Sequence, residues 1–222
     1  MIVEGYTLGV FASNCYIAAE KDGSSAVLFD AGQDAAEVIP ERLKALGLTL
    51  ETVLLTHGHI DHIWGAQAVA DAAQVPAYIH PSDRFMIEDP GAAFGRMGMG
   101  KMDVGTPADL RDLTDGDVFQ FGGLKVETKH TPGHTPGHCV FLTDGIVFSG
   151  DLIFAGSVGR TDLPGGSFEE LMESIRRVIL PLQDDVVILS GHGPQTNVGT
   201  ERVSNPFVLT DGQPERMRLL GL

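Results

Sequence analysis

Hydrophobic residues gather in short runs along the chain, and glycine, proline or polar residues bound most of these runs. Short runs rich in Val, Ile and Phe are typical of β-strands, and the fully apolar ones indicate strands buried on both faces. Elsewhere the apolar positions take the spacing of an amphipathic helix. The predicted strands are residues 2–8, 15–19, 26–29, 52–55, 76–79, 118–121, 124–129, 139–142, 146–148 and 186–189, and the predicted helices are residues 35–46, 63–73 and 168–179.

Local signals mark the ends of two helices. Gly47 follows the first predicted helix, where a glycine favours a stop, and Ser167 is placed to cap the last one. Residues 86–105 are rich in glycine and methionine and lack periodicity, so we predict a mobile, lid-like segment there. The chain after Asn197 is weakly patterned, and we predict no element for it.

The two halves of the chain follow one order of elements. Each has several strands that look antiparallel, then a helix, then a buried strand that ends in a histidine-bearing loop. VLLTHGH in the first half corresponds to VVILSGHG in the second, and no linker-like stretch separates them. We therefore expect two sheets packed face to face with helices outside, in one domain.

Composition narrows the classes of partner. The chain has 222 residues, and 15 basic residues against 30 acidic ones give a net charge of -15, which argues against nucleic acid as a general partner. The N-terminus lacks a signal-peptide pattern and no run reaches the ~18 apolar residues of a membrane span, so we predict a cytoplasmic protein without a membrane partner. Cys15 and Cys139 lie in apolar stretches and are interpreted as buried free thiols. Oligomeric state stays open.

The stretch LLTHGHIDHIWG, residues 54–65, carries the strongest chemical signal. His57 and His59 are two apart, so in an extended chain both imidazoles point the same way. On a helix the same spacing would splay them by about 200°. Asp61 and His62 follow as the chain turns toward the next helix. Four potential ligands packed this closely do not fit comfortably around one metal ion, whereas two neighbouring ions resolve the geometry.

Further candidate ligands follow other predicted strands. KHTPGHTPGHC offers His130, His134 and His138 in a turn rich in Gly and Pro, Asp151 directly follows a strand in VFSGD, and His192 follows another in ILSGHG. Sites built from loops on a rigid scaffold are common in enzymes. Imidazole and carboxylate together suit zinc, iron or manganese.

These spaced motifs, T-H-x-H-x-D-H, PGHTPGH, SGD and GH, resemble the metallo-β-lactamase superfamily over nearly the whole chain. The resemblance implies a four-layer αββα sandwich, in the α/β class, with two divalent transition-metal ions at one edge of its two sheets. Zinc is the first expectation, with iron or manganese as alternatives. The ligands implied for the first ion are His57, His59 and His134, those for the second are Asp61, His62 and His192, and Asp151 would bridge the two.

Such a pair of ions has a known use in catalysis. Two ions can share a bridging water and lower its pKa toward ~7, which yields a hydroxide nucleophile at neutral pH. Asp61 could also orient that hydroxide, so we count it as a catalytic candidate. The ions would make the site locally positive on an acidic protein.

Two stretches point to one branch of the superfamily. FAGSVGRTDLPGGS and GHGPQTNVGTERVSNPF resemble glyoxalase II-like hydrolases of the short bacterial type, which cleave S-D-lactoylglutathione and related thioesters. The resemblance implies a small-molecule thioester substrate and places Arg160 beside it as a second catalytic candidate. The extra C-terminal helical region by which full-length members grip glutathione has no counterpart here, so the thiol carrier stays open.

Other readings remain. The runner-up is a persulfide dioxygenase that holds one iron through the equivalents of His57, His134 and Asp151, although the SGHGPQT stretch looks more like the hydrolase branch. A lactone or β-lactam hydrolase, or a non-catalytic metal-binding member, is a further alternative. The complete ligand set argues against the non-catalytic reading.

The remaining histidines are predicted to be no ligands. We expect His80 to be structural or on the rim of the site. His130 is expected to support the site or to end its strand, and His138 to orient the loop that carries His134.

Overall fold

The computed structural model describes residues 1–21, 23–94 and 104–211. Its strands form two six-stranded sheets and one two-stranded sheet. The first sheet contains, in spatial order, β1 (Ile2–Leu8), β2 (Ser13–Ala19), β3 (Ser25–Phe29), β4 (Thr49–Leu54), β5 (Ala77–Ile79) and β6 (Leu110–Asp112). The second contains β14 (Thr196–Asn197), β13 (Val187–Ser190), β10 (Ile146–Gly150), β9 (Cys139–Thr143), β8 (Leu124–His130) and β7 (Val118–Phe121). The small sheet pairs β11 (Ile153–Phe154) with β12 (Ser157–Val158).

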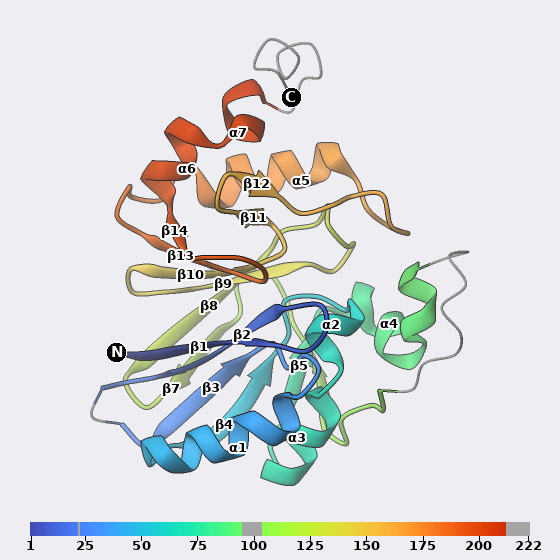
Figure 1. The fold of residues 1–222 in the computed structure, drawn as a ribbon, viewed down its shortest axis with the longest axis vertical. Helices are drawn as coiled ribbons and strands as arrows, with labels where there is room; N and C mark the ends of the chain where they lie inside the picture. The colour runs from blue at the N-terminus through green and yellow to red at the C-terminus, as the bar shows by residue number, and fades with distance from the viewer. Residues whose placement is uncertain (22, 95–103, 212–222) are drawn as a thin grey trace.

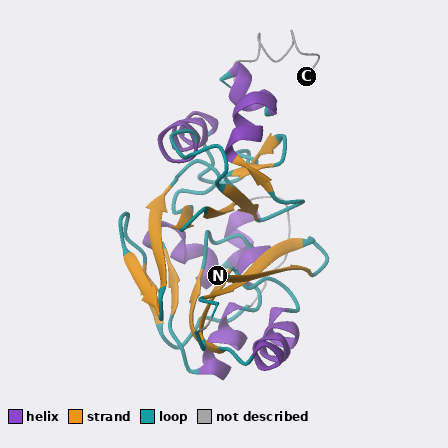
Figure 2. Ribbon diagram, turned by 90° about the vertical axis from the view of Figure 1, so that its left-hand side faces the viewer, coloured by secondary structure: helices purple, strands orange, loops and turns teal. Residues whose placement is uncertain are grey.

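Helices cover the outer face of each sheet. Figure 1 shows α1 and α3 below the first sheet and α5, α6 and α7 above the second, and Figure 2 shows the same layers from the side. The predicted four-layer αββα sandwich is therefore confirmed. The helices are α1 (Ala35–Leu46), α2 (Ile60–Ile63), α3 (Ala66–Ala73), α4 (Arg84–Glu88), α5 (Phe168–Ser174), α6 (Val198–Ser204) and α7 (Pro206–Thr210), with short 3-10 segments η1 (Pro81–Asp83) and η2 (Pro90–Phe94) and a π-helical turn η3 (Ile175–Ile179).

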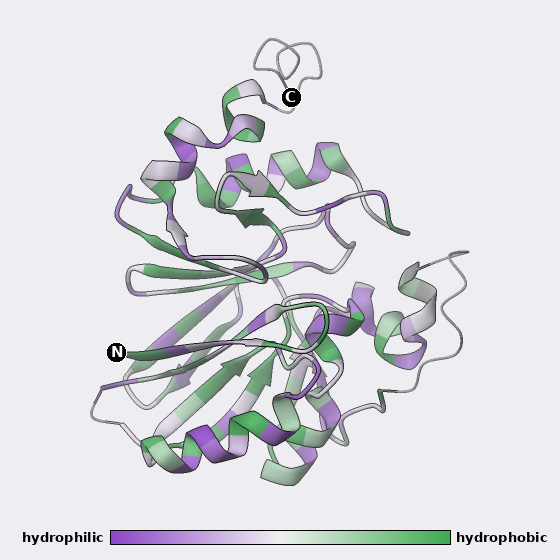
Figure 3. Ribbon diagram, in the orientation of Figure 1, coloured by the Kyte–Doolittle hydropathy of each residue, from purple (hydrophilic) through white to green (hydrophobic). Residues whose placement is uncertain are grey.

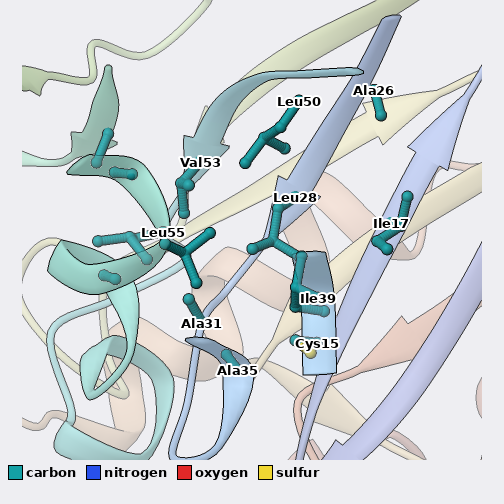
Figure 4. Packing of buried hydrophobic residues seen from close by; sticks show 14 of the residues in the cluster. Cys15, Ile17, Ala26, Leu28, Ala31, Ala35, Ile39, Leu50, Val53 and Leu55 are labelled. Atoms are coloured by element: carbon teal, nitrogen blue, oxygen red, sulfur yellow. The ribbon is translucent and has the colours of Figure 1, made fainter. Parts of the chain in front are cut away.

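The apolar strands are buried on both faces, as their composition predicted. Along β2, Cys15, Ile17 and Ala19 face the core between the first sheet and helices α1 and α3, a part of which Figure 4 shows. Tyr16 and Ala18 alternate with them and face the second sheet. Figure 3 shows hydrophobic residues along the strands, whereas α1 carries residues of both kinds. This alternation fixes the register of each strand, because a slip by one residue would exchange its two faces.

Aromatic rings join the two sheets at the centre of the molecule. Phe29 of β3 stacks on Phe148 of β10 with 3.7 Å between ring centroids, and it also contacts Phe141 of β9. A third core lies between the second sheet and α5, where Val147 packs near Leu171 and other apolar residues. The two sheets are thus one packed body, and their strand ends are held rigidly relative to each other.

The order of connections positions the loops that matter. β1, β2 and β3 pair antiparallel, and β4 then joins β3 in parallel through α1. In the second half, β7 to β10 pair antiparallel, and β13 joins β10 in parallel through α5. Parallel neighbours end at the same edge of a sheet. The loops after β3 and β4, and those after β10 and β13, therefore leave at shared edges.

Most predicted elements are present, and their ends agree within a few residues. Gly47 ends α1 with a positive φ, and the Ser167 side chain accepts a hydrogen bond from the Glu170 N–H, so both end signals are confirmed. Cys15 and Cys139 are buried free thiols, as predicted. No helix among the described residues is both long and apolar enough to cross a bilayer.

The predicted helix over residues 63–73 is confirmed for Ala66–Ala73, which form α3, but its predicted start is wrong. The helix begins earlier, at Ile60, and breaks between α2 and α3. The Gly65 N–H bonds to the Ala31 carbonyl at 2.7 Å, and a Cβ at Gly65 would lie only 2.8 Å from the Gly32 carbonyl oxygen. The backbone of the next loop therefore takes the place that a continuous helix would need.

Two segments without predicted elements are in fact helical. The tail contains α6 and α7, which are capped by the side chains of Asn197 and Asn205. The start of the segment predicted to be lid-like forms the end of α4 and η2. The rest of that prediction, over residues 95–103, lies outside the described residues.

Candidate metal centre

The first candidates follow β4 directly. His59 keeps an extended backbone, with φ −66° and ψ 145°, and the rings of His57 and His59 lie edge to face with centroids 4.8 Å apart. Both imidazoles thus face one region, as their spacing predicted. Asp61 and His62 lie on α2, the helical turn that follows.

The remaining candidates come from the second sheet. His134 lies in the loop between β8 and β9, Asp151 is the first residue after β10, and His192 follows β13. An isolated β-bridge pairs His192 with Ser13 of β2, so the two sheets touch at this edge. Four separate segments of the chain therefore meet at one place.

The donor atoms of His57, His59 and His134 form a tight group. The Nε2 atom of His134 lies 2.8 Å from Nδ1 of His59 and 3.2 Å from Nε2 of His57. All three side chains are buried. Such a group of imidazole nitrogens matches the set implied for a first ion.

A second group lies beside the first. The Nε2 atom of His192 lies 3.1 Å from Oδ2 of Asp61 and 3.4 Å from Nε2 of His62. Asp151 stands between the groups: its Oδ1 lies 3.4 Å from Nε2 of His62 and its Oδ2 lies 3.6 Å from Nε2 of His134. The structure thus brings together all seven side chains named from the sequence motifs.

Hydrogen bonds behind the site fix which nitrogen faces inward in the rings of His57, His62 and His134. The Asp30 carboxylate accepts the Nδ1 proton of His62 at 2.8 Å. It also accepts the hydroxyl proton of Thr56, whose oxygen is then free to accept from Nδ1 of His57 at 3.0 Å. Both rings therefore turn Nε2 toward the centre of the site, where it presents a lone pair whenever the ring is neutral.

His134 is held in the same manner by the backbone. Its Nδ1 donates to the Arg160 carbonyl oxygen at 2.7 Å, so its Nε2 also presents a lone pair. The Oδ1 atom of Asp151 is buried, and no described residue donates a hydrogen bond to it. Lone pairs and carboxylate oxygens that face one another at these distances require protons or metal cations between them. The donor set therefore fits transition-metal ions.

Burial and charge act in different directions on these rings. Burial lowers the pKa of His59 to about 3 and that of His134 to about 4, so both are neutral and able to ligate at neutral pH. Burial also opposes the charged form of His62, but the nearby carboxylates, Asp61 and Asp151 first among them, raise its pKa to about 10. This part of the site favours a positive charge, which a bound metal ion would supply in place of the proton.

Sequence reasoning missed Asp30 and Thr56. Asp30 is almost fully buried and adopts a left-handed φ of 58° at the end of β3. The signal was available, because a lone aspartate directly after a fully apolar strand is placed to support a site at the strand ends. Thr56 gave no such signal, because its role depends on the partners that folding brings to it.

Arg160 lies at the mouth of the site. Its guanidinium pairs with both carboxylate oxygens of Asp162, at 2.7 Å and 2.8 Å, and its side chain is about half exposed. A pocket of about 380 Å³ opens here over the donor atoms. It is lined by Phe11, His59, Asp61, His134, Asp151, Phe154, Val158, Arg160, Leu163 and His192.

The other histidines lie behind or beside the ligand candidates. His138 accepts the backbone N–H of Asp151 at 3.1 Å and contacts the Thr131 hydroxyl, so it ties Asp151 to the loop that carries His134. His130 stacks on His80 with 4.0 Å between ring centroids.

Comparison with known proteins assigns the chain to a family. The family model described as the metallo-beta-lactamase superfamily matches residues 8–192. The chain therefore belongs to the metallo-β-lactamase superfamily, and the histidine and aspartate cluster lies within the matched region.

One relative and three solved structures are similar to this chain over most of its length. The hydroxyacylglutathione hydrolase GloC of Haemophilus influenzae is 36% identical over 211 residues, which cover 94% of this chain and 98% of that protein. The structure of BLEG-1, a B3 metallo-beta-lactamase, superposes with a TM-score of 0.84 at 37% identity and covers 93% of this chain and 99% of that one. TTHA1623 in a di-iron-bound form gives 0.80 at 36% identity (92% and 99%), and ETHE1 from Myxococcus xanthus gives 0.80 at 25% identity (100% and 92%).

Proposed function

We propose that this metallo-β-lactamase superfamily hydrolase cleaves a thioester, such as S-D-lactoylglutathione, into a carboxylic acid and a free thiol. The observation that carries the proposal is the convergence of the seven side chains into two adjoining groups that share Asp151. The identity to GloC over almost the full length of both chains supports the thioester as substrate.

The donor set divides between two ions. His57, His59 and His134 would hold one ion, Asp61, His62 and His192 the other, and Asp151 would reach both. Two bound ions supply Lewis acidity, which polarises a substrate carbonyl and lowers the pKa of a shared water. Zinc fits these ligands, and so does iron, which a similar protein contains as a di-iron centre.

Side chains around the pocket would orient the water and bind the substrate. Asp61 is partly exposed and lines the pocket, so its carboxylate can accept a hydrogen bond from the attacking water and orient it. Phe11, Phe154 and Leu163 form an apolar wall that would contact the acyl group and exclude bulk water. Arg160 can donate to a carboxylate or carbonyl of the thiol carrier.

A mononuclear iron persulfide dioxygenase is the second candidate. His57, His134 and Asp151 include two imidazoles and one carboxylate, the ligand set of many non-haem iron oxygenases. The second group, Asp61 with His62 and His192, favours the hydrolase, because a mononuclear enzyme does not need it.

One experiment separates these candidates. Protein purified without added metal is analysed for metal content and is then assayed for thiol release from S-D-lactoylglutathione and for oxygen consumption with glutathione persulfide. A lactone and a penicillin complete the panel, because BLEG-1 is a metallo-beta-lactamase. We expect up to two ions per chain and thiol release that a chelator abolishes and zinc, iron or manganese restores. Thiol release by chelator-washed protein would refute the proposal, and one iron with oxygen consumption would assign the dioxygenase.

A further inference from the structure

A buried carboxylate outside both histidine motifs joins the two loops that carry the first group of donors. Asp83 is the last residue of η1, after β5, and its side chain is fully buried. It accepts hydrogen bonds from the backbone N–H of Gly58 at 3.0 Å, from the Thr135 hydroxyl at 2.6 Å and from the backbone N–H of Gly137 at 2.6 Å.

These three donors belong to the two ligand loops. Gly58 lies between His57 and His59, whereas Thr135 follows His134 directly. One side chain therefore bonds both loops at positions next to the ligand candidates. A change in its position would move the donor nitrogens that now lie 2.8 Å and 3.2 Å apart.

The packing around Asp83 leaves little freedom. A Cβ at Gly58 would lie 2.9 Å from the Asp83 carbonyl oxygen, and a Cβ at Gly137 would lie 2.7 Å from the Asp83 carboxyl carbon. Both loops thus approach Asp83 as closely as only glycine allows. Among the described residues, no Lys or Arg pairs with Asp83, so the three hydrogen bonds stabilise its carboxylate.

We propose that Asp83 is a positioning residue of the metal centre, which sets the distance between the His57–Gly58–His59 loop and the loop that carries His134. The inference rests on the metal site of the proposed function. It adds a residue that, within the described part of the chain, forms no hydrogen bond with a ligand candidate's side chain and acts through two backbone N–H groups and the Thr135 hydroxyl. Hydrogen bonds of this indirect kind commonly tune metal affinity by about 10- to 100-fold.

The chain offers a matched control. Glu201 is also buried, and it also accepts hydrogen bonds from one backbone N–H, one hydroxyl and one further N–H, those of Gly156, Thr196 and Asn205. It holds the β11–β12 hairpin and bonds neither of the two loops that Asp83 joins. Asp83→Asn and Glu201→Gln therefore remove equivalent charges from equivalent surroundings.

The test measures zinc affinity of the metal-free protein by competition with a chromogenic chelator, alongside its melting temperature. We expect Asp83→Asn to bind zinc about 10- to 100-fold more weakly than wild type and to change the visible spectrum of the cobalt-loaded protein. Glu201→Gln should melt at a lower temperature but bind zinc as tightly as wild type. Equal zinc affinity of Asp83→Asn and wild type, or an equal loss in both variants, would overturn the proposal.

A second variant keeps the test decisive if Asp83→Asn does not fold. Thr135→Val removes one of the three donors, and it should weaken zinc binding in the same direction by a smaller factor. Unchanged affinity and an unchanged cobalt spectrum in that variant would count against Asp83. Absence of zinc binding by the wild type would instead refute the proposed function, so the two failures are distinguishable.

Discussion

At the scale of single residues, the two groups of donors share Asp151 and differ in their other members. We call His57, His59 and His134 the inner group, and Asp61, His62 and His192 the outer group. His62 of the outer group contacts Asp151, which lies between both groups. We expect His62→Ala to lose the outer ion and to retain most of the inner one. Asp151→Ala should lose most of both ions and all activity. Metal analysis after dialysis checks this, with His80→Ala as a control that keeps its metal. Identical losses in His62→Ala and Asp151→Ala would contradict the division of ligands.

Arg160 acts on the site through two different groups. Its carbonyl oxygen holds His134, and this contact survives truncation of the side chain. Its guanidinium would bind an anionic thiol carrier, and since such a bond contributes about 1.5–3 kcal/mol, Arg160→Ala should lower kcat/KM for an anionic thioester roughly 10- to 150-fold. Metal content should not change.

A neutral thioester of similar size serves as the control for Arg160. It should lose much less rate, because it makes no ion pair with the guanidinium. Asp162→Asn should act in the opposite direction on the anionic substrate, since Asp162 now shares the guanidinium. Equal losses for anionic and neutral thioesters would show that Arg160 is only a structural residue of its loop.

The sequence predicted which ligand candidates gather, but it did not predict what holds them. Four metal-competent side chains within His57–His62 and three more at strand ends form a pattern with few other uses. Asp30 gives only the weak signal of a lone aspartate after an apolar strand, and Thr56 and Asp83 give none, because the hydrogen bonds of Asp30 and Asp83 reach residues that are distant in the sequence. Such partners are known only once the fold is known.

At the scale of elements, Ser167 begins the helix that covers the second sheet. Its hydroxyl caps the Glu170 N–H at 3.3 Å. Ser167→Ala should lower the free energy of unfolding by about 0.5–2 kcal/mol, as N-cap replacements do. Urea unfolding at fixed metal content measures this change. Ser204→Ala, an exposed helix position, should stay within about 0.5 kcal/mol of wild type. A Ser167→Ala protein as stable as that control would exclude the cap.

Elements were predictable where the spacing of apolar residues reflects which faces are buried. β2, β3 and β13 are mostly apolar and are covered on both faces, and α1 shows one apolar side. α6 carries Val and Gly, which are weak helix formers, and it buries Glu201 through hydrogen bonds to distant residues. Tertiary contacts make this helix, so its composition does not reveal it. The asparagine followed by proline at Asn205 was the one local sign of α7.

At the scale of the whole molecule, the ligand candidates come from both sheets. Ions bound there would link the two halves of the sandwich and stabilise only the folded state. Zinc at a free concentration of about 100 times its dissociation constant adds about 2.7 kcal/mol, which corresponds to a rise in Tm of roughly 5–10 °C for a chain of this size. Calorimetry with and without chelator measures the change. A Tm that chelator and zinc leave unchanged would contradict a metal shared between the halves.

Exposure differs across the seven ligand candidates. His57, His59 and His134 are buried, whereas Asp61 and His192 are partly open to solvent at the pocket. An ion held by the inner group would therefore be less accessible to water and chelators than an ion held by the outer group. We expect the inner ion to exchange slowly once the chain has folded. The metal found in each molecule would then record the supply of ions in the cell when that molecule folded, and two batches grown on different media would differ in metal while sharing one fold.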